Sequence, residues 1–160
     1  MIEGCAFTGH RQIKNEHKKH IGNLLSRAVD FAYSEGCRNF YTGGAVGFDT
    51  LAAREVIRFR LSHPDVRLIM LLPCHDQEAH WSRSQIESYE YTLSEADEIK
   101  YISDTYDSTC MIKRNVALAE AADIMIAYVG RGASGSAQTV GMARRMGKTV
   151  YNLYPSLEKM

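Results

Sequence analysis

The sequence has no excess of charge of either sign, because 19 basic and 19 acidic residues balance to a formal net charge of zero in 160 residues. Nonspecific nucleic-acid binding depends on positive charge that neutralises phosphates and releases counterions. The balanced composition therefore argues against that class of function, although it leaves room for a local basic groove.

Long apolar runs and paired cysteines are also missing. No stretch approaches the roughly 20 apolar residues of a membrane-spanning helix, and the amino terminus is typical of a strand and not of a signal peptide. The four cysteines (Cys5, Cys37, Cys74 and Cys110) form no Cys-x-x-Cys pair, which favours free thiols in a reducing compartment. We therefore expect a cytoplasmic protein with no membrane partner.

Short apolar runs alternate with stretches of helical periodicity along the whole chain. The predicted order is strand Ile2–Thr8, helix Lys14–Ser34, strand Asn39–Thr42, helix Phe48–Leu61, strand Val66–Leu72, helix Arg83–Ala96, strand Glu98–Ile102, helix Ser108–Ala122, strand Asp123–Val129, helix Ser136–Met146 and strand Thr149–Leu153. This alternation predicts an α/β fold with a Rossmann-like, doubly wound, mostly parallel sheet flanked by helices on both faces. The length of 160 residues fits a single domain over residues 1–160.

Ligands of such sheets bind outside the carboxyl ends of the strands, so the residues after each strand are candidates. Thr8, Gly9, His10 and Arg11 follow the first strand. The glycine lets a ligand approach the backbone, and the arginine offers a fork that matches phosphate oxygens. A turn with an exposed arginine explains this tetrapeptide equally well.

The second strand is followed by three glycines that directly precede a helix. Gly43, Gly44 and Gly47 predict backbone N–H groups and a positive helix end that face an anion. No Gly-Lys-Ser/Thr follows, so this is not a P-loop. Asp49, in the first helical turn, either complements the helix dipole or accepts hydrogen bonds from a ribose or base.

The third and fourth strands are followed by weaker candidates. Gln77 and Trp81 come after the third strand, and Trp81 either belongs to the core or stacks on a base. Arg114 and Asn115 lie near the start of the following helix, where they either reach the cleft or belong to a solvated face. The nearby cysteine and histidines match no common zinc spacing, so we expect no metal.

The loop after the fifth strand is a second segment rich in glycine and serine that leads into a helix. Its candidate residues are Gly130, Gly132, Ser134, Gly135, Ser136 and Thr139. Two such loops in one short chain are typical of a phosphate-binding site. A bulky side chain at Gly44 or Gly135 is then expected to abolish binding and to leave the fold intact.

In chain order, Thr-Gly-His-Arg, Gly-Gly-Ala-Val-Gly-Phe-Asp, Pro-Cys-x-x-Gln, Lys-Arg-Asn and the late Gly/Ser loop resemble the YpsA-like branch of the SLOG superfamily. That superfamily also groups the DNA-processing protein DprA with the LOG-type phosphoribohydrolases. The resemblance covers nearly the whole chain and implies a Rossmann-like fold, a nucleotide-derived ligand and a homodimer. It matches these positions to functional ones of the family: Gly43, Gly44, Gly47, Asp49, Arg114, Gly132, Ser134, Gly135 and Ser136.

One position departs from the LOG-type pattern. Those enzymes carry Pro-Gly-Gly-x-Gly-Thr-x-x-Glu, whose glutamate is taken to help cleave an N-glycosidic bond. Thr139 stands at that position here, and a threonine hydroxyl cannot act as a carboxylate acid or base. The candidate substitutes are Asp49, from the other loop, or another carboxylate of the cleft, so the sequence favours a binding protein over an enzyme.

Three functions follow, in order of preference. The first is binding of a nucleotide or an ADP-ribose-like ligand, as a sensor or sequestering protein that requires no cofactor. The second is hydrolysis of a nucleoside monophosphate or related N-glycoside. The third is DprA-like binding of single-stranded DNA, for which Arg11, Arg114 and Arg131 are the available cleft cations.

Overall fold

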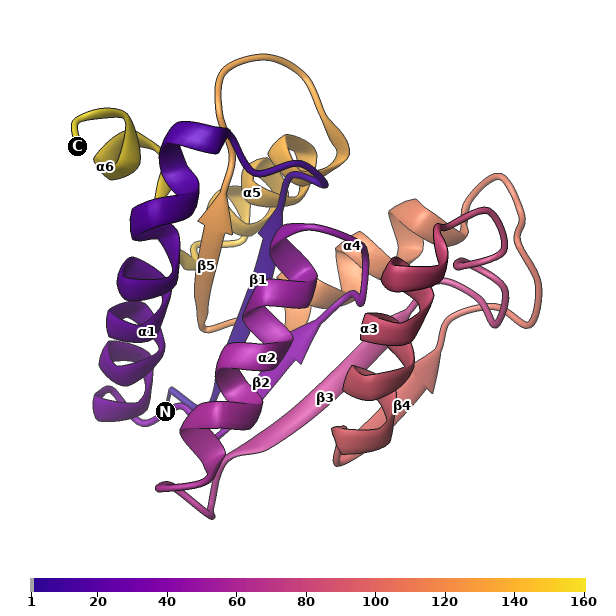
Figure 1. Cartoon of the computed structure of the whole chain (residues 1–160), viewed down its shortest axis with the longest axis horizontal. Helices are drawn as coiled ribbons and strands as arrows, with labels where there is room; N and C mark the ends of the chain where they lie inside the picture. Colours follow the sequence, from indigo (N-terminus) through magenta and orange to yellow (C-terminus); the bar gives the residue numbers. More distant parts are fainter. Residues whose placement is uncertain (1) are drawn as a thin grey trace.

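The computed structural model describes residues 2–160 and contains a six-stranded sheet whose paired strands all run parallel (Figure 1). The strands are β1 (Gly4–Gly9), β2 (Asn39–Thr42), β3 (Arg67–Leu72), β4 (Glu98–Tyr101), β5 (Ile124–Tyr128) and β6 (Thr149–Asn152). Their order across the sheet is β4-β3-β2-β1-β5-β6. The chain therefore builds outward from β1 to β4, crosses back, and adds β5 and β6 on the other side of β1.

Helices cover both faces of the sheet. They are α1 (Lys18–Ser34), α2 (Phe48–Arg60), α3 (Arg83–Glu95), α4 (Cys110–Ala121), α5 (Gly135–Arg145) and the short α6 (Tyr154–Glu158). Figure 1 shows α1, α2 and α3 in front of the sheet and α4 and α5 behind it. The predicted Rossmann-like, doubly wound α/β fold is confirmed.

The central strands are buried on both faces because alternate residues enter opposite core layers. Cys5 and Phe7 of β1 pack with the α1–α3 layer, whereas Ala6 between them packs with the α4–α5 layer. In β5, Ile126 belongs to the first layer and Met125 to the second. This double burial explains why the strands are continuous apolar runs in the sequence.

The direction of the connections reverses between β1 and β5. These strands pair directly, with Thr8 opposite Ala127 and Gly9 opposite Tyr128, yet the chain leaves them toward opposite edges of the sheet. Diverging connections leave a crevice above the carboxyl ends of the two strands. The fold thus places the residues after β1 and β5 side by side.

The first strand begins at Gly4 and not at Ile2, and the helices differ from the predictions in further places. The predicted first helix is split, because Asn15–His17 form a 3₁₀ turn before α1. The fourth helix begins at Cys110 and not at Ser108. The preceding residues form a turn, in which the Asp107 carboxylate accepts the Thr109 N–H at 2.8 Å. The terminal helix α6 was not predicted, since its five residues are too few to show periodicity.

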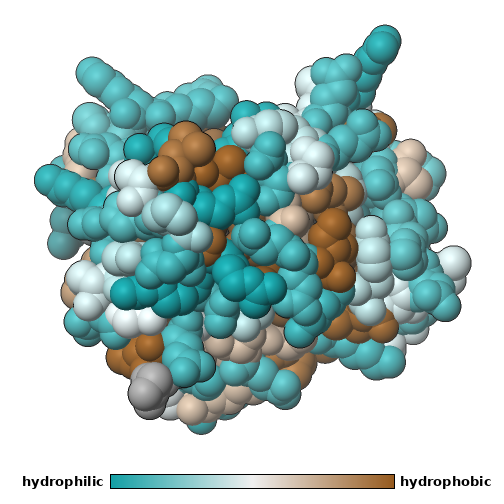
Figure 2. Space-filling model, turned by 90° about the horizontal axis from the view of Figure 1, so that it is seen from below, coloured by the Kyte–Doolittle hydropathy of each residue, from teal (hydrophilic) through white to brown (hydrophobic). Residues whose placement is uncertain are grey.

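The end of the molecule that carries the amino ends of the strands is mostly hydrophilic, with apolar patches between the polar residues (Figure 2). No helix within residues 2–160 is both long and apolar enough to cross a membrane. The four cysteines are buried and have free thiols.

Candidate functional site

A cavity of about 290 Å³ lies at the carboxyl ends of the strands, beside the point where the connections reverse. Most of its lining was predicted from the sequence: Thr8, Gly9, His10, Arg11, Asp49, Arg114, Asn115, Ser134, Gly135 and Ser136. The remaining lining residues are Ala45, Met111 and Leu118. The fold therefore brings together residues from the loops after β1, β2 and β5 and from α4.

Arg114 projects from α4 and is almost entirely buried, with 5% of its surface exposed. Its Nη1 donates to the Gly43 carbonyl oxygen at 2.7 Å, and its Nε donates to Asn115 Oδ1 at 2.9 Å. No carboxylate forms an ion pair with it within residues 2–160. Burial lowers its pKa, and the charge of Asp49 opposes that shift. A buried guanidinium with only neutral acceptors is a favourable partner for an anion.

Asp49 is the carboxyl group of the cavity. It lies in the first turn of α2, is 5% exposed, and its Oδ2 accepts the Ala45 N–H at 3.2 Å. Burial raises its pKa to about 6, against the lowering effect of Arg114. The group therefore changes its proton occupancy close to neutral pH, which suits an acid or base.

His10 has a defined role as a donor. Its Nε2 faces the Gly130 N–H at 2.8 Å and must accept from it, so the proton of the neutral ring sits on Nδ1. Nδ1 lies 3.4 Å from Ser136 Oγ, and burial lowers the pKa of the ring. Because its lone pair is already engaged, His10 cannot serve as a base that activates Ser136.

The start of α5 offers free backbone donors. The Ser134 side chain caps the helix by accepting the Ala137 N–H at 3.0 Å, and the Ser134 backbone carbonyl accepts the Gln138 N–H. The N–H groups of Gly135 and Ser136 donate to no acceptor in the part of the chain that the structure describes. Free N–H groups at a helix N-terminus are a ready anion site.

The glycines after β2 are turned into the protein. The Gly43 carbonyl holds Arg114, and the Gly44 N–H donates to Thr42 Oγ1 at 3.4 Å. Gly44 has a φ of +71°, and a Cβ there would lie 2.7 Å from Leu72 Cδ2. Gly47 also has a positive φ, and it lies against the backbone of Arg11. These glycines therefore satisfy turn geometry and packing and do not line the cavity.

Five other predicted residues lie outside the cavity lining. Gln77 Nε2 donates to the Gly43 carbonyl and to Tyr89, and Trp81 packs edge-on against Tyr89 with ring centroids 5.1 Å apart. Gly130 supports His10, Gly132 is exposed in open space, and the buried Thr139 hydroxyl donates to the Gly135 carbonyl. No ligand role for any of them is visible in the contacts, and such a role remains a prediction.

Met111 and Leu118 were missed, although the sequence carried a signal for them. Together with Arg114 and Asn115 they follow the i, i+3, i+4, i+7 spacing of one helix face. The two apolar residues line the same cavity as the buried arginine. Within residues 2–160 no three histidine, cysteine or acidic side chains gather as a metal would require.

The chain matches known proteins over nearly its full length. A family model named YpsA and described as the YspA SLOG family matches residues 5–153. A UPF0398 protein of Bacillus thuringiensis (strain Al Hakam) is 26% identical over 158 residues, covering 93% of this chain and 86% of the relative. A UPF0398 protein of Bacillus cereus (strain Q1) matches equally well.

Two solved structures share the fold. DNA processing protein A (DprA) of Streptococcus pneumoniae superposes with a TM-score of 0.67 at 17% identity, covering 94% of this chain and 50% of that chain. DprA of Helicobacter pylori, described for its single-stranded DNA binding mode, gives 0.65 at 20% identity, covering 92% and 63%. The chain thus spans half of the first DprA and under two thirds of the second, and at these identities the likeness shows the fold alone.

Proposed function

The chain belongs to the YspA SLOG family, and we propose that it binds a nucleotide or a nucleotide-derived, ADP-ribose-like ligand by its phosphate, as a sensor or sequestering protein. The observation that carries the proposal is the buried Arg114, whose hydrogen bonds go to neutral acceptors and which lines the same cavity as the start of α5. A phosphate there gains a charged donor and the free N–H groups of Gly135 and Ser136.

The charge of the cavity supports an anionic ligand. Arg11 and Arg114 are both cationic, and the neutral His10 presents a donor. Asp49 is the acidic residue among those that line the cavity, and its charge offsets that of one arginine. The side chains that line the cavity therefore carry a net positive charge, although the net charge of the whole chain is zero.

Calorimetric titration with AMP, cyclic AMP and ADP-ribose tests the proposal directly. We expect binding of at least one of these probes, and Arg114→Gln should weaken it about 10- to 100-fold, the worth of a charge-assisted hydrogen bond. Arg131→Gln is the matched control, because Arg131 is exposed and lines a separate hollow. Absence of binding for all three probes would reject the proposal.

A second candidate is N-glycoside hydrolysis, and the position of Asp49 favours it. A buried carboxyl group with a pKa of about 6 in the cavity has the properties of a general acid or base. Chromatography after incubation with AMP would show adenine and ribose 5-phosphate if the bond is cleaved. Loss of that product in Asp49→Asn would support this candidate, whereas intact AMP at high protein concentration would remove it.

The arrangement of the arginines does not favour DNA binding. Arg11 and Arg114 line the cavity, with Arg114 buried, whereas Arg131 lines a separate hollow with Tyr154 and Lys159. A DNA strand needs cations that follow one accessible path. A gel shift with single-stranded DNA that weakens with salt would overturn this interpretation.

A further inference from the structure

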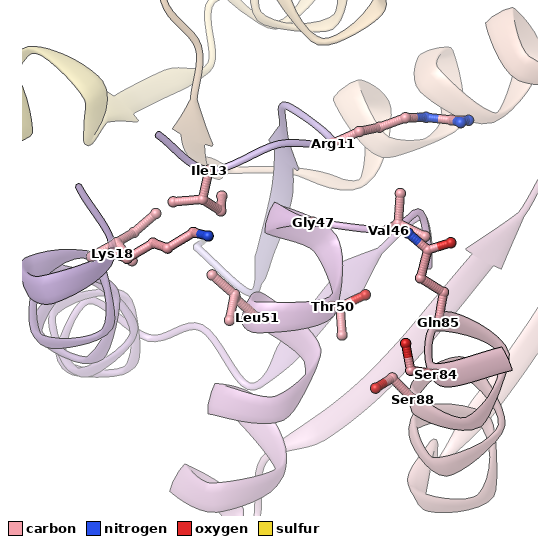
Figure 3. Close-up of a pocket in the computed structure, with 11 residues that line it drawn as sticks. Arg11, Ile13, Lys18, Val46, Gly47, Thr50, Leu51, Ser84, Gln85 and Ser88 are labelled. Atoms are coloured by element: carbon pink, nitrogen blue, oxygen red, sulfur yellow. The ribbon is translucent and has the colours of Figure 1, made fainter. Parts of the chain in front are cut away.

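A groove of about 470 Å³ adjoins the cavity on the side of the sheet that carries α1, α2 and α3 (Figure 3). Arg11 lines both hollows. The loop before α2 separates them, since Ala45 lines the cavity and Val46 lines the groove. One elongated ligand that passes Arg11 can therefore occupy both.

The groove combines an apolar surface with a polar rim. Its apolar residues are Ile13, Ile21, Val46 and Leu51, and its polar residues beside the cations are Thr50, Ser84, Gln85 and Ser88. In Figure 3 the hydroxyls of Ser84 and Ser88 on α3 lie across the groove from Ile13 and Leu51. A nucleoside has the same two properties, an apolar ring face and a hydrogen-bonding edge.

The charge of the groove is also positive. Lys18 and Arg11 form no ion pair with any carboxylate in the described part of the chain, whereas the nearby Lys14 is paired with Glu158 at 2.9 Å. No acidic side chain lines the groove. Figure 3 shows the Lys18 ammonium group directed toward Leu51, inside the groove. These cations complement a ligand that carries negative charge beside its rings.

We infer that the groove binds the second half of a two-part nucleotide joined by a diphosphate. One phosphate lies at the start of α5, the other at Arg11, and the attached nucleoside rests on Val46 and Leu51. This inference rests on the proposed function and narrows its ligand class from nucleotides in general to diphosphate-linked ones. The cavity alone, at about 290 Å³, is at the small end of the ligand pockets of proteins, roughly 300–1,000 Å³.

The test compares AMP with ADP-ribose by calorimetry on the wild type and on variants of the groove. Lys18→Glu reverses the charge of the groove, and Ser84→Trp fills it; both side chains are exposed, so the fold should tolerate the changes. Lys19→Glu is the matched control, because Lys19 is the next residue along and does not line the groove.

We expect the wild type to bind ADP-ribose at least about tenfold more tightly than AMP. Lys18→Glu and Ser84→Trp should remove that advantage, with AMP affinity and the Lys19→Glu control unchanged. Equal affinities for the two probes in the wild type, or an advantage that survives both groove variants, would overturn the inference while the proposed function stands. Failure of both probes to bind would also overturn the inference, and failure of cyclic AMP in addition would reject the proposed function.

Discussion

The two glycine-rich loops have similar compositions and opposite structural roles. The loop after β2 closes on the protein: Gly44 packs against Leu72, and the Ala45 N–H is taken by Asp49. The loop after β5 packs only at its start, where a Cβ at Gly130 would lie 2.7 Å from Tyr154 Cζ. It is open farther on, because a Cβ at Gly132 meets nothing within 4 Å and one at Gly135 meets only Asn115 Nδ2 at 3.8 Å. Glycine therefore serves packing in the first loop, whereas in the second loop it leaves the backbone at the start of α5 open.

Under the proposed function, this contrast divides the site into a scaffold and a binding edge. The first loop places Asp49 and, through the Gly43 carbonyl, holds Arg114 in position. The second loop presents free N–H groups to the cavity. Substitutions in the first loop should therefore change stability most, and substitutions in the second should change binding most.

The largest effect is expected for Gly44→Val. The backbone at Gly44 has a φ of +71°, and the new side chain would collide with Leu72, Met70 and Tyr89. Left-handed backbone and overpacking together cost about 2–5 kcal/mol of unfolding free energy. Urea denaturation should show this loss, which corrects the expectation that a bulky residue here leaves the fold intact. If the variant unfolds at the same urea concentration as the wild type, the first loop is not the rigid scaffold.

Asp49→Asn should change how stability depends on pH. Burial raises the pKa of Asp49 to about 6 from the ordinary value of 3.8, so the folded state binds this proton more tightly than the unfolded state. The associated stability is fully present below pH 4 and is lost as the pH rises through about 6, by roughly 3 kcal/mol.

The asparagine is neutral at every pH and should flatten that dependence, which leaves the variant more stable than the wild type at pH 7.5. Urea denaturation of both proteins at intervals from pH 4 to pH 7.5 measures the effect. Parallel curves for the two proteins would show that Asp49 titrates alike in the folded and unfolded states.

Gly135→Val should separate binding from stability. The site has space for a side chain, so the unfolding free energy should stay within about 1 kcal/mol of the wild type. The branched side chain would stand among the N–H groups at the start of α5 and should weaken AMP or ADP-ribose binding at least about tenfold. Calorimetry measures the change in affinity. If the variant binds AMP and ADP-ribose as tightly as the wild type, the phosphate binds elsewhere.

The smallest effect is expected for Gly132→Ala. Its φ of +101° disfavours any side chain, but the surrounding space is open. The cost should be about 1 kcal/mol from the backbone alone, and ligand affinity should not change, since Gly132 does not line the cavity. Thermal unfolding and calorimetry together check this, and a large loss of affinity would extend the binding edge to Gly132.

The helices and strands could be predicted well because the periodicity of apolar residues, and the residue types that begin and end an element, are local properties of the sequence. The strand Asn39–Thr42 matches at both ends, and the two predicted helices that contain Leu25 and Val56 are present, with both residues buried. The sheet order is a tertiary property that no local pattern contains. It decides that the loops after β1 and β5, far apart in the chain, face each other.

The site was predicted less sharply than the fold. Residue types identified Arg114 and Ser134–Ser136 as candidates, but composition could not distinguish the packed Gly44 from the open Gly135. Trp81 could be predicted either as a core residue or as a base-stacking residue, and the structure shows it packed edge-on against Tyr89. Only the position of each residue relative to distant ones separates these cases.

The most direct test of phosphate binding at the start of α5 is a titration of ¹⁵N-labelled protein with AMP, followed by NMR through the backbone amide resonances of both loops. We expect downfield shifts for Gly135 and Ser136, whose N–H groups are free to donate to phosphate, and little change for Gly44 and Ala45, whose N–H groups are already engaged. Large shifts at Gly44 and Ala45 with none at Gly135 and Ser136 would contradict phosphate binding at the start of α5.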